Sequence, residues 1–326
     1  MNKLNLSFDD VLAAKERLSP YLTPTPLRNY PSLDKIIGNN IHAYIKHENH
    51  LPTNSFKYRN GISAVTALSP EERIKGVVAA TLGNHGQGVA LAATLLGIQS
   101  KICVPIGNNS DKNAAIINFG GTLIEKGKDY DEAVEVAKDL MLNLGMTMIH
   151  SVNNLNVIAG AATLTLELIE QLPDIDALVL CVGGGTHAAG AITVIQAINP
   201  KIKIYGVQAE GAPANHDAWH AKKPIPGDKT DTFADGVRTR NIYEMTYQTL
   251  QDGLSDFITV SDLETAHALR LYLEHTHNLV EGAGAIGLAG LLKLKNILAG
   301  KKVGLVLTGS NIDQATLKKV LTNEFV

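Results

Sequence analysis

One lysine stands in a setting that suits covalent chemistry. Lys57 follows Ser55 and Phe56 at the predicted start of a helix, a few residues after Pro52. A lysine amine held in a partly dry pocket has a lowered pKa and can condense with a carbonyl group. Most lysines at such positions are solvated residues on a helix surface. Lys57 is therefore a candidate nucleophile that needs support from other residues.

A run of glycines lies between an apolar segment and a helical one. Gly183 to Gly185 precede Thr186, and bare backbone N–H groups at a helix start suit a phosphate. Two other interpretations stay open. The first and third glycines with Ala188 have the spacing of a dinucleotide-binding turn, and Glu210 follows the next strand as a candidate ribose-binding acid. The glycines could also form a tight turn that binds nothing.

Two further turns carry polar side chains. The segment 81–88 follows a predicted strand, and its Asn84 offers a hydrogen-bond donor and an acceptor. Asn84 could also serve only as a helix N-cap. The segment 308–311 follows the last predicted strand and places hydroxyl groups at the carboxyl edge of the sheet, where doubly wound folds bind ligands.

Histidine spacing gives little support for a metal site. His47 and His50 are one residue short of the spacing that puts two histidines on one helix face. His216 and His220 have that spacing, but they fall within residues 211–231, which hold three prolines and are predicted to be irregular. We therefore predict no bound metal.

The elements that must position these residues follow an alternating plan. Apolar, β-rich runs alternate with helical patterns, which predicts parallel strands joined by crossover helices on both faces. The expected strands are 43–46, 77–80, 101–106, 122–125, 147–150, 177–182, 203–208 and 302–307. The expected helices include 56–68, 85–96, 129–144, 157–171 and 263–276.

Length and composition restrict the class of protein. The 326 residues suffice for two domains or one large α/β unit. Because 29 Lys and Arg nearly balance 32 Asp and Glu, we expect a small-molecule partner and neither nucleic acid nor a membrane. Cys103 and Cys181 lie in apolar runs, which predicts buried, reduced thiols. Residues 1–10 lack a basic region followed by an apolar core, which predicts no signal peptide and a cytoplasmic protein.

Motifs along nearly the whole chain resemble one enzyme family. They are Thr25-Pro26-Leu27, Lys46-His47-Glu48-Asn49, Ser55-Phe56-Lys57, Gly83-Asn84-His85-Gly86-Gln87, Val157-Ile158-Ala159-Gly160, Gly183-Gly184-Gly185, Ala234-Asp235-Gly236 and Glu281-Gly282-Ala283-Gly284-Ala285. In this order and spacing the chain resembles the serine/threonine dehydratases and serine racemases, which are fold type II pyridoxal phosphate enzymes related to the tryptophan synthase β chain.

The resemblance implies both a fold and an assembly. The expected fold is α/β, with two three-layer domains built on mainly parallel twisted sheets. Residues 1–74 and 150–326 would form the large cofactor-binding domain, and residues 75–149 the small mobile domain. The family pattern also implies a homodimer or homotetramer.

The resemblance implies roles for individual residues as well. Lys57 would bind pyridoxal 5'-phosphate covalently and act as the catalytic base. The other cofactor-binding residues would be Phe56 on the ring, Asn84 at the ring hydroxyl, Gly183, Gly184, Gly185 and Thr186 at the phosphate, Thr308 at the pyridine nitrogen, and Glu281. The substrate-binding residues would be Ser55, Thr81, Leu82, Gly83, Asn84, His85 and Gly236.

Four positions depart from the family pattern. Thr186 replaces a fourth glycine, and Thr308 replaces the usual serine. Gln208 aligns with the glutamate of the racemases' metal-binding loop and cannot bring a charge to a cation. Leu82 stands where the racemases have a second acid/base serine.

These residues together predict an ammonia-lyase. We expect a pyridoxal phosphate-dependent dehydratase that converts a β-hydroxy amino acid, L-threonine or L-serine first, to a 2-oxo acid and ammonia. Alternatives with the same cofactor are a 3-hydroxyaspartate dehydratase and an amino acid racemase. More distant alternatives are a dinucleotide-dependent oxidoreductase and a non-catalytic ligand-binding protein.

Overall fold

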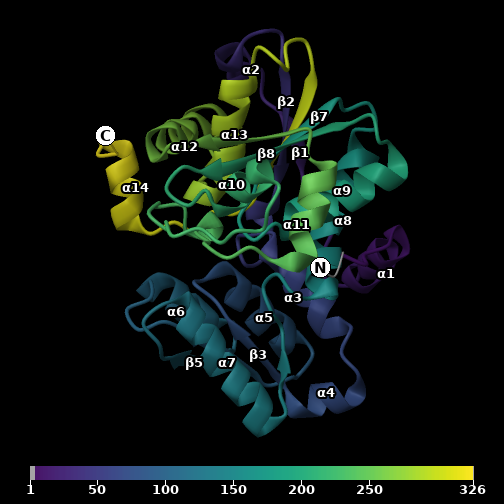
Figure 1. The fold of residues 1–326 in the computed structure, drawn as a ribbon, viewed down its shortest axis with the longest axis vertical. Coiled ribbons are helices and arrows are strands. Elements are labelled where there is room, and N and C mark those ends of the chain that lie inside the picture. Colours follow the sequence, from purple (N-terminus) through teal and green to yellow (C-terminus); the bar gives the residue numbers. More distant parts are fainter. Residues whose placement is uncertain (1–3, 326) are drawn as a thin grey trace. The chain divides into compact units, whose positions relative to one another are not determined.

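The computed structural model describes residues 4–325, which form two compact units. Unit 1 consists of the described residues of Met1–Asn5, Pro24–His50 and Leu164–Val326. Unit 2 consists of Leu6–Thr23 and Leu51–Thr163. Each unit has its own sheet (Figure 1).

Unit 1 is built on a six-stranded sheet in the order β1-β2-β10-β7-β8-β9. All its strand pairs are parallel except β1 with β2. Its elements are β1 Leu27–Asn29, α2 Pro31–Ile37, β2 His42–His47, the 3-10 helix η1 Glu48–His50, β7 Ala177–Cys181, α9 Thr186–Ile198, β8 Lys203–Ala209, α10 Ala214–Ala221, the 3-10 helix η2 Asp235–Val237, α11 Glu244–Gly253, β9 Asp256–Val260, α12 Asp262–Thr276, α13 Gly282–Leu294, β10 Lys302–Leu307 and α14 Gln314–Leu321.

Helices cover both faces of this sheet. Successive side chains of a strand point to opposite faces. In β10, Leu305 points toward Gly287 of α13, whereas the face at Gly304 meets Leu168 of α8 (Leu155–Gln171). Unit 1 therefore has three layers, with its main hydrophobic core between the sheet and α12 and α13.

Unit 2 is built on a four-stranded parallel sheet in the order β5-β4-β3-β6. Its elements are α1 Phe8–Leu18, α3 Lys57–Thr66, α4 Pro70–Lys75, β3 Val77–Ala80, α5 Asn84–Leu95, β4 Ser100–Val104, α6 Ser110–Asn118, β5 Thr122–Glu125, α7 Tyr130–Leu144 and β6 Thr147–Met148. Helix α8 begins in this unit and ends in unit 1.

The apolar residues of β3 show why this sheet also needs two helical layers. Val77 and Ala79 belong to the hydrophobic cluster that includes α3 and α5. Val78 and Ala80 belong to the cluster on the side of α7. A strand that is buried on both faces is apolar throughout, as β3 is.

The α/β class with mainly parallel sheets, predicted from the sequence, is confirmed. The eight expected strands are present with ends that differ by at most two residues. Two strands were missed: β1 is only three residues long, and β9 carries a mixed burial pattern.

Two local predictions were wrong. The segment 211–231 is not irregular throughout, because α10 forms within it. This helix begins after Pro213 and ends at Lys222, whose backbone is in the left-handed conformation. Cys181 is half-buried rather than buried, because it is the last residue of β7, whereas Cys103 is buried.

The domain limits expected from the resemblance remain a prediction. Unit 2 contains the segment 75–149 together with residues 6–23, 51–74 and 150–163. Residues 57–66 belong with unit 2 because α3 packs closely on α5, where glycines allow the two backbones to approach.

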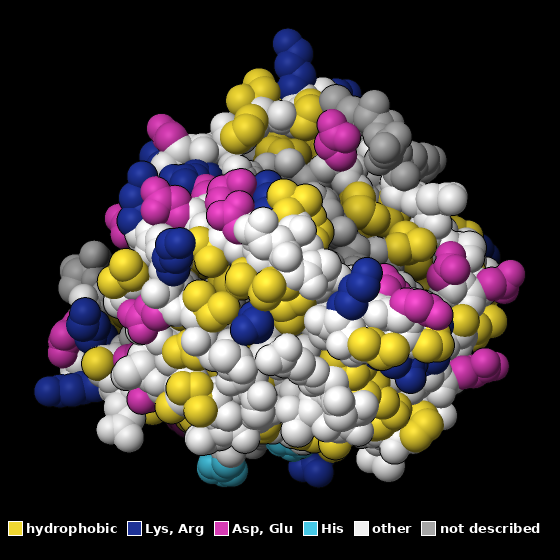
Figure 2. All heavy atoms as spheres, turned by 90° about the horizontal axis from the view of Figure 1, so that it is seen from below, with side chains coloured by type: hydrophobic (Ala, Val, Ile, Leu, Met, Phe, Trp, Pro, Cys, Tyr) yellow, Lys and Arg dark blue, Asp and Glu magenta, His cyan; other side chains and the backbone are white. Residues whose placement is uncertain are grey.

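Figure 2 shows one face of the molecule, where hydrophobic side chains are scattered among charged and polar ones. Lys and Arg side chains lie mixed with Asp and Glu on that face. Large exposed hydrophobic residues on the described chain include Ile74, Ile106 and Leu142. Single exposed apolar residues are ordinary on protein surfaces. Among residues 4–325, no helix has the length and hydrophobicity that a membrane span requires.

Candidate active site

Lys57 is the first residue of α3, and its side chain is half-buried. Asn54 adopts a left-handed conformation that turns the chain into this helix. The Lys57 ammonium lies 4.7 Å from the centre of the Phe56 ring, within the range of a cation–π contact. Ser55 is fully buried, and its Oγ has no hydrogen-bond partner among the described residues. A buried hydroxyl without a partner beside a half-buried amine is typical of a site that a ligand completes.

The turn between β3 and α5 is organised by Thr81. Its Oγ1 accepts hydrogen bonds from the backbone N–H of Gly83 at 2.8 Å and of Gly86 at 3.2 Å. Helix α5 then begins at Asn84, which is half-buried like Leu82. The N–H groups of Gly83 and Gly86 are used within the turn, and the start of α5 at Asn84 and His85 has the polarity that suits a carboxylate.

The helices α3 and α5 meet close to Lys57. A Cβ added to Gly88, one turn into α5, would lie 2.3 Å from the carbonyl oxygen of Lys57. A Cβ added to Gly61 would lie 2.2 Å from the carbonyl oxygen of Gly88. The starts of the two helices, with Lys57 and Asn84, are therefore held together within unit 2.

His85 is buried and electrically neutral. Burial, together with the nearby charge of Lys57, lowers the pKa of His85 to about 3. Its Nε2 lies 2.8 Å from the carbonyl oxygen of Ile149, which can only accept, so Nε2 carries the proton. Nδ1 is then an unprotonated acceptor, and it has no partner among residues 4–325. His85 can orient a donor but is a poor acid.

In unit 1 the glycine turn follows β7 and leads into α9. Gly185 has a φ of +89°, which favours glycine, and α9 begins at Thr186. A Cβ at Gly183 would lie 2.8 Å from the carbonyl oxygen of Gly236, so the turn and η2 are in close contact. Strand β10 lies beside β7 in parallel, which places Thr308 at the same edge of the sheet.

Glu281 joins this group from the start of α13. Its backbone N–H donates to the carbonyl oxygen of Gly309 at 3.0 Å, and its side chain is buried. A Cβ at Gly236 would lie 2.9 Å from that of Ala283, in the first turn of α13. The predicted residues of unit 1 therefore converge on the carboxyl ends of β7 and β10.

The predicted residues thus form two groups, one in each unit. Unit 2 holds Ser55, Phe56, Lys57, Thr81, Leu82, Gly83, Asn84 and His85. Unit 1 holds Gly183, Gly184, Gly185, Thr186, Gly236, Glu281 and Thr308. Each group is brought together by its own sheet and helices.

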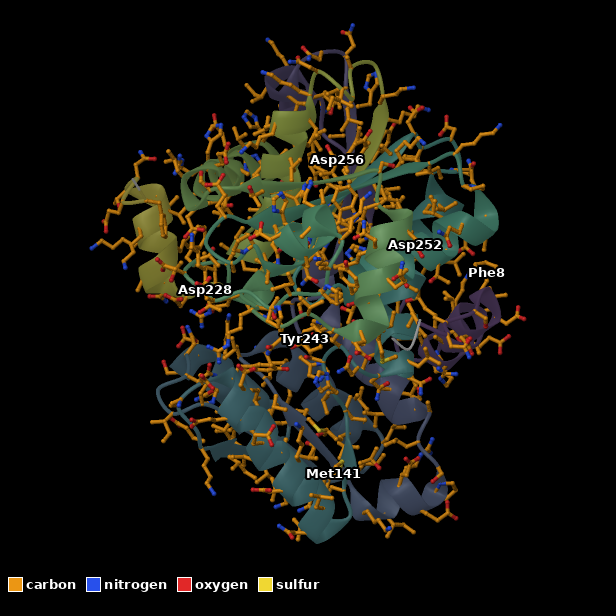
Figure 3. All side chains as sticks on the ribbon, viewed as in Figure 1. Phe8, Met141, Asp228, Tyr243, Asp252 and Asp256 are labelled. Atoms are coloured by element: carbon orange, nitrogen blue, oxygen red, sulfur yellow. The ribbon has the colours of Figure 1, made fainter. Side chains whose placement is uncertain are left out.

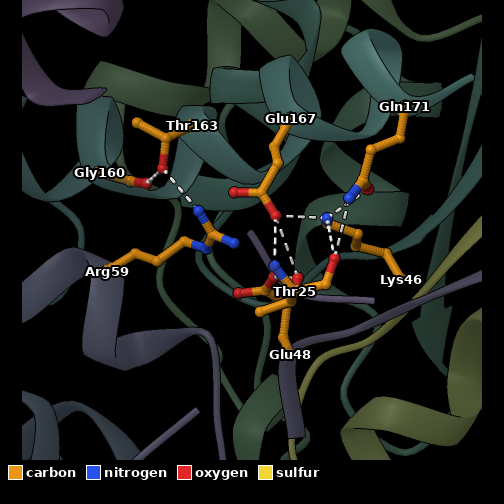
Figure 4. Close-up of polar contacts among 8 residues, drawn as sticks. All are labelled: Thr25, Lys46, Glu48, Arg59, Gly160, Thr163, Glu167 and Gln171. Carbon is orange, nitrogen blue, oxygen red and sulfur yellow. Dashed lines mark hydrogen bonds and ion pairs between the residues drawn. The ribbon is translucent and has the colours of Figure 1, made fainter. Parts of the chain in front are cut away.

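A buried polar network in unit 1 was not expected (Figure 4). The ammonium of Lys46 donates to Glu167 at 2.5 Å, to Gln171 at 2.7 Å and to the carbonyl oxygen of Thr25 at 2.8 Å. The hydroxyl of Thr25 donates to Glu48 at 2.8 Å. Lys46 and Glu48 belong to one of the motifs that carry the resemblance, and their buried contacts point to a structural role at the end of β2.

A buried lysine was also missed. Lys112 of α6 is buried, and its side-chain carbons lie against Gly83, where an added Cβ would meet Cδ at 2.5 Å. A lone lysine within a helix gives no signal in the sequence, since only the packing of α6 on the turn brings it there.

The histidines considered as metal ligands lie in two separate pairs. The rings of His216 and His220 lie 4.4 Å apart on α10, and Nε2 of His220 contacts the carbonyl oxygen of Phe257. His47 and His50 stack at 4.9 Å. Among the described residues, no three His, Cys, Asp or Glu side chains are grouped as a metal site requires.

Both groups have the chemistry that pyridoxal phosphate requires. In unit 2 the amine of Lys57 can condense with an aldehyde, and Ser55, whose buried hydroxyl has no partner among the described residues, lies two residues before it in the chain. In unit 1 the glycine turn at the start of the 13-residue helix α9 offers backbone N–H groups to a phosphate. The residues therefore fit the cofactor.

Comparisons with known proteins agree with this chemistry. The chain is 34% identical over 321 residues to an L-threonine ammonia-lyase of Thermotoga maritima, covering 98% of this chain and 79% of that protein. It is 33% identical over 307 residues to an L-threo-3-hydroxyaspartate ammonia-lyase of a Pseudomonas species, covering 94% of this chain and 96% of that protein. The structure of maize serine racemase superimposes with a TM-score of 0.91 at 31% identity, over 98% of both chains.

A family model decides the interpretation of the glycine turn. The model described as "Pyridoxal-phosphate dependent enzyme" matches residues 18–309, which include both groups of predicted residues. The dinucleotide interpretation of Gly183, Gly185 and Ala188 is therefore wrong, and Glu210, its candidate ribose ligand, is an exposed residue 3.8 Å from Lys293. The fold is that of the type II enzymes. The chain belongs to the pyridoxal-phosphate dependent enzyme family, and pyridoxal phosphate is its cofactor.

Proposed function

We propose that this enzyme is an ammonia-lyase that converts a β-hydroxy amino acid, L-threonine or L-serine, to a 2-oxo acid and ammonia. The observation that carries the proposal is the 34% identity to an L-threonine ammonia-lyase across 98% of the chain. The reaction removes the α-proton and the β-hydroxyl as water, and a later hydrolysis takes up water and releases ammonia.

We propose the following roles for individual residues in this reaction. Pyridoxal phosphate, when bound, would supply an aldehyde for the substrate amine and an electron sink that makes the α-proton acidic. Lys57 anchors the cofactor through its amine and then accepts the proton from the α-carbon. The start of α5 at Asn84 and His85 holds the substrate carboxylate, with Ser55 as a further donor.

The remaining proposed roles concern the cofactor. Gly183, Gly184, Gly185 and Thr186 would hold its phosphate, Phe56 and Asn84 would contact the ring, and Glu281 and Gly236 would line the site. Thr308 would offer a hydroxyl to the pyridine nitrogen, which would leave that nitrogen largely unprotonated and would favour prompt elimination.

A substrate panel tests the proposal. Release of 2-oxo acid is measured from both enantiomers of threonine and serine and from threo-3-hydroxyaspartate. We expect one enantiomer of threonine or serine to be the best substrate. Absence of 2-oxo acid from every member of the panel would contradict the proposal.

The second candidate substrate is 3-hydroxyaspartate, because a curated relative that acts on its L-threo form covers 94% of the chain. An extra side-chain carboxylate suits an arginine. Arg238 is exposed and lies 3.6 Å from Asp235, and Arg240 is half-buried in the following loop. If this candidate holds, Arg238→Ala or Arg240→Ala should lower kcat/KM for 3-hydroxyaspartate about tenfold or more relative to serine. Unchanged preference in both variants would remove the arginines from consideration.

The proposal extends to assembly and location. We propose a homodimer or homotetramer in the cytoplasm, with residues 75–149 acting as the small mobile domain. Light scattering on the purified holoenzyme measures the assembly, and a monomer would contradict it.

A further inference from the structure

Two buried side chains hold the backbone carbonyls of the glycine turn. Nδ2 of Asn215, on α10, donates to the carbonyl oxygen of Gly183 at 2.8 Å. Oγ1 of Thr246, on α11, donates to the carbonyl oxygen of Gly184 at 2.8 Å. Asn215 is 2% exposed and Thr246 is fully buried. Figure 3 labels Tyr243 and Asp252, which mark the two ends of α11.

These contacts decide where the N–H groups of the turn point. In a trans peptide the carbonyl oxygen and the following N–H lie on opposite sides of the chain. No cis peptide occurs among residues 4–325. Because the carbonyls of Gly183 and Gly184 face Asn215 and Thr246, the N–H groups of Gly184 and Gly185 point away from α10 and α11.

A run of glycines needs such restraint more than other sequences do. Glycine reaches both signs of φ at little cost, so a peptide in this turn could rotate and present its oxygen instead of its N–H. A carbonyl oxygen facing a phosphate would repel it. Packing supports the restraint, since a Cβ on Gly185 would lie 3.0 Å from Oγ1 of Thr246.

The orientation of Asn215 follows from the carbonyl it contacts. An amide turned the other way would place its own oxygen against the oxygen of Gly183. In the observed orientation Oδ1 is buried without a partner among the described residues. Asn215 therefore keeps its hydrogen bond to the turn while its own Oδ1 stays buried without a partner among the described residues. A buried acceptor without a partner costs free energy, and a residue that only fills space would not need to carry that cost.

We infer that Asn215 and Thr246 are positioning residues that aim the N–H groups of Gly184 and Gly185 at the cofactor phosphate. The inference rests on the proposed placement of the phosphate at this turn. Neither residue belongs to the motifs that carry the family resemblance.

The test compares two ligands that differ only in the phosphate. The apoprotein is titrated with pyridoxal phosphate and with pyridoxal, and both dissociation constants are measured from absorbance. Asn215→Asp and Thr246→Val each remove a donor while keeping the side-chain shape. Asn215→Asp also adds a negative charge near the phosphate, so Thr246→Val, which adds none, is the deciding variant. We expect each to weaken pyridoxal phosphate about tenfold and to leave pyridoxal within about twofold, whereas Thr246→Ser, which keeps the hydroxyl, should retain the affinity of the unaltered protein.

A matched control separates positioning from general damage. Thr265 of α12 is also fully buried, and its hydroxyl donates to a backbone carbonyl, that of Ser261, at 2.9 Å. Thr265→Val should leave the ratio of the two dissociation constants unchanged. Thermal unfolding of each apoprotein shows whether it is folded, and Thr246→Val carries the test if Asn215→Asp does not fold.

Three other results of these measurements bear on the inference. Retention of the full phosphate preference by Thr246→Val, or parallel weakening of both ligands, would overturn the positioning role. If the unaltered protein binds pyridoxal as tightly as pyridoxal phosphate, the placement of the phosphate at the turn fails first, and this inference fails with it. Failure of the substrate panel alone would leave the binding result standing.

Discussion

At the scale of single residues, the environment of Lys57 differs from that of Lys46, the other lysine of the motifs that carry the resemblance. It begins a helix, it is half-buried against Phe56, and the nearby His85 is neutral. Lys46, by contrast, is fully buried and occupied by three acceptors. An amine for covalent chemistry must be reachable, which favours Lys57.

Replacing Lys57 should abolish turnover. In Lys57→Ala both the covalent anchor and the base are lost, and a loss of about 10³-fold or more in kcat is expected. The unaltered holoenzyme should show a visible absorption band that borohydride bleaches, with the reduced adduct on Lys57. Lys35→Ala, on α2, is the control and should be unaffected. Ammonia release by Lys57→Ala near the parent rate would contradict the assignment.

Leu82 bears on the choice between elimination and racemisation. Racemisation needs a second acid/base group on the face of the α-carbon opposite Lys57, and an isobutyl group can neither donate nor accept a proton. The hydroxyl of Thr81, next in the chain, is engaged with the N–H groups of Gly83 and Gly86. We expect the unaltered enzyme to eliminate without appreciable racemisation and Leu82→Ser to gain measurable racemase activity.

Chiral analysis of serine recovered from both proteins measures this difference. Leu82→Ala is the control, since it opens the same space without supplying a hydroxyl. Racemisation by the unaltered enzyme as fast as its ammonia release would show that another residue delivers the second proton.

At the scale of elements, both groups of candidate residues lie where strands end and helices begin. Thr81 follows β3, and the glycine turn follows β7. In each sheet the strand order reverses beside these strands, where open α/β sheets bind ligands. Glycines permit the close helix contacts that fix these ends.

The contact between α3 and α5 should be sensitive to one methyl group. In Gly88→Ala the new Cβ would lie 2.3 Å from the carbonyl oxygen of Lys57, and backbone cannot move aside cheaply. We expect destabilisation of about 3 kcal/mol and a displaced Lys57 with lower kcat. Leu95→Ala, at an exposed site near the end of the same helix, should have a small effect. Urea denaturation and steady-state kinetics measure both, and unchanged stability of Gly88→Ala would contradict the packing.

At the scale of the whole molecule, three histidines are held as neutral groups: His47 and His85 are buried, and His150 is half-buried. Burial lowers the pKa of His47 and of His150 to about 4, and that of His85 to about 3. Nδ1 of His150 accepts the backbone N–H groups of Val152 and Asn153, each at 3.0 Å, which requires an unprotonated nitrogen. Unfolded histidine has a pKa near 6.5.

Stability should therefore fall as the pH falls from about 6.5 to about 4. In this window the unfolded chain binds protons that the folded chain does not, so the stabilisation present above pH 6.5 is lost on acidification. Each histidine contributes up to about 1.4 kcal/mol per pH unit. Urea midpoints at pH 7.5, 6 and 5 measure the loss. His150→Gln should flatten the dependence, whereas the exposed His42→Gln should not, and equal midpoints at all three pH values would contradict the prediction.

The fold class, most strands and, through the family resemblance, the cofactor could be predicted from the sequence. Apolar runs such as those of β3 and β7 are long enough to identify buried strands, and the motifs around Lys57 and the glycine turn have fixed order and spacing. These signals are local in the chain, so one sequence displays them. Short or half-buried elements such as β1, β9 and α10 lack a clear pattern and were missed.

Contacts between residues far apart in the chain could not be predicted from the sequence. Asn215 and Thr246 contact the glycine turn because α10 and α11 pack there, 32 and 62 residues away along the chain. The ammonium of Lys46 donates to Glu167, which lies 121 residues away along the chain. Only packing in the folded chain removes the water that would otherwise separate the two side chains. The burial that neutralises His85 and His150 arises in the same way. Residue type and spacing specify what a side chain can do, but contacts, burial and pKa depend on neighbours that only the folded chain supplies.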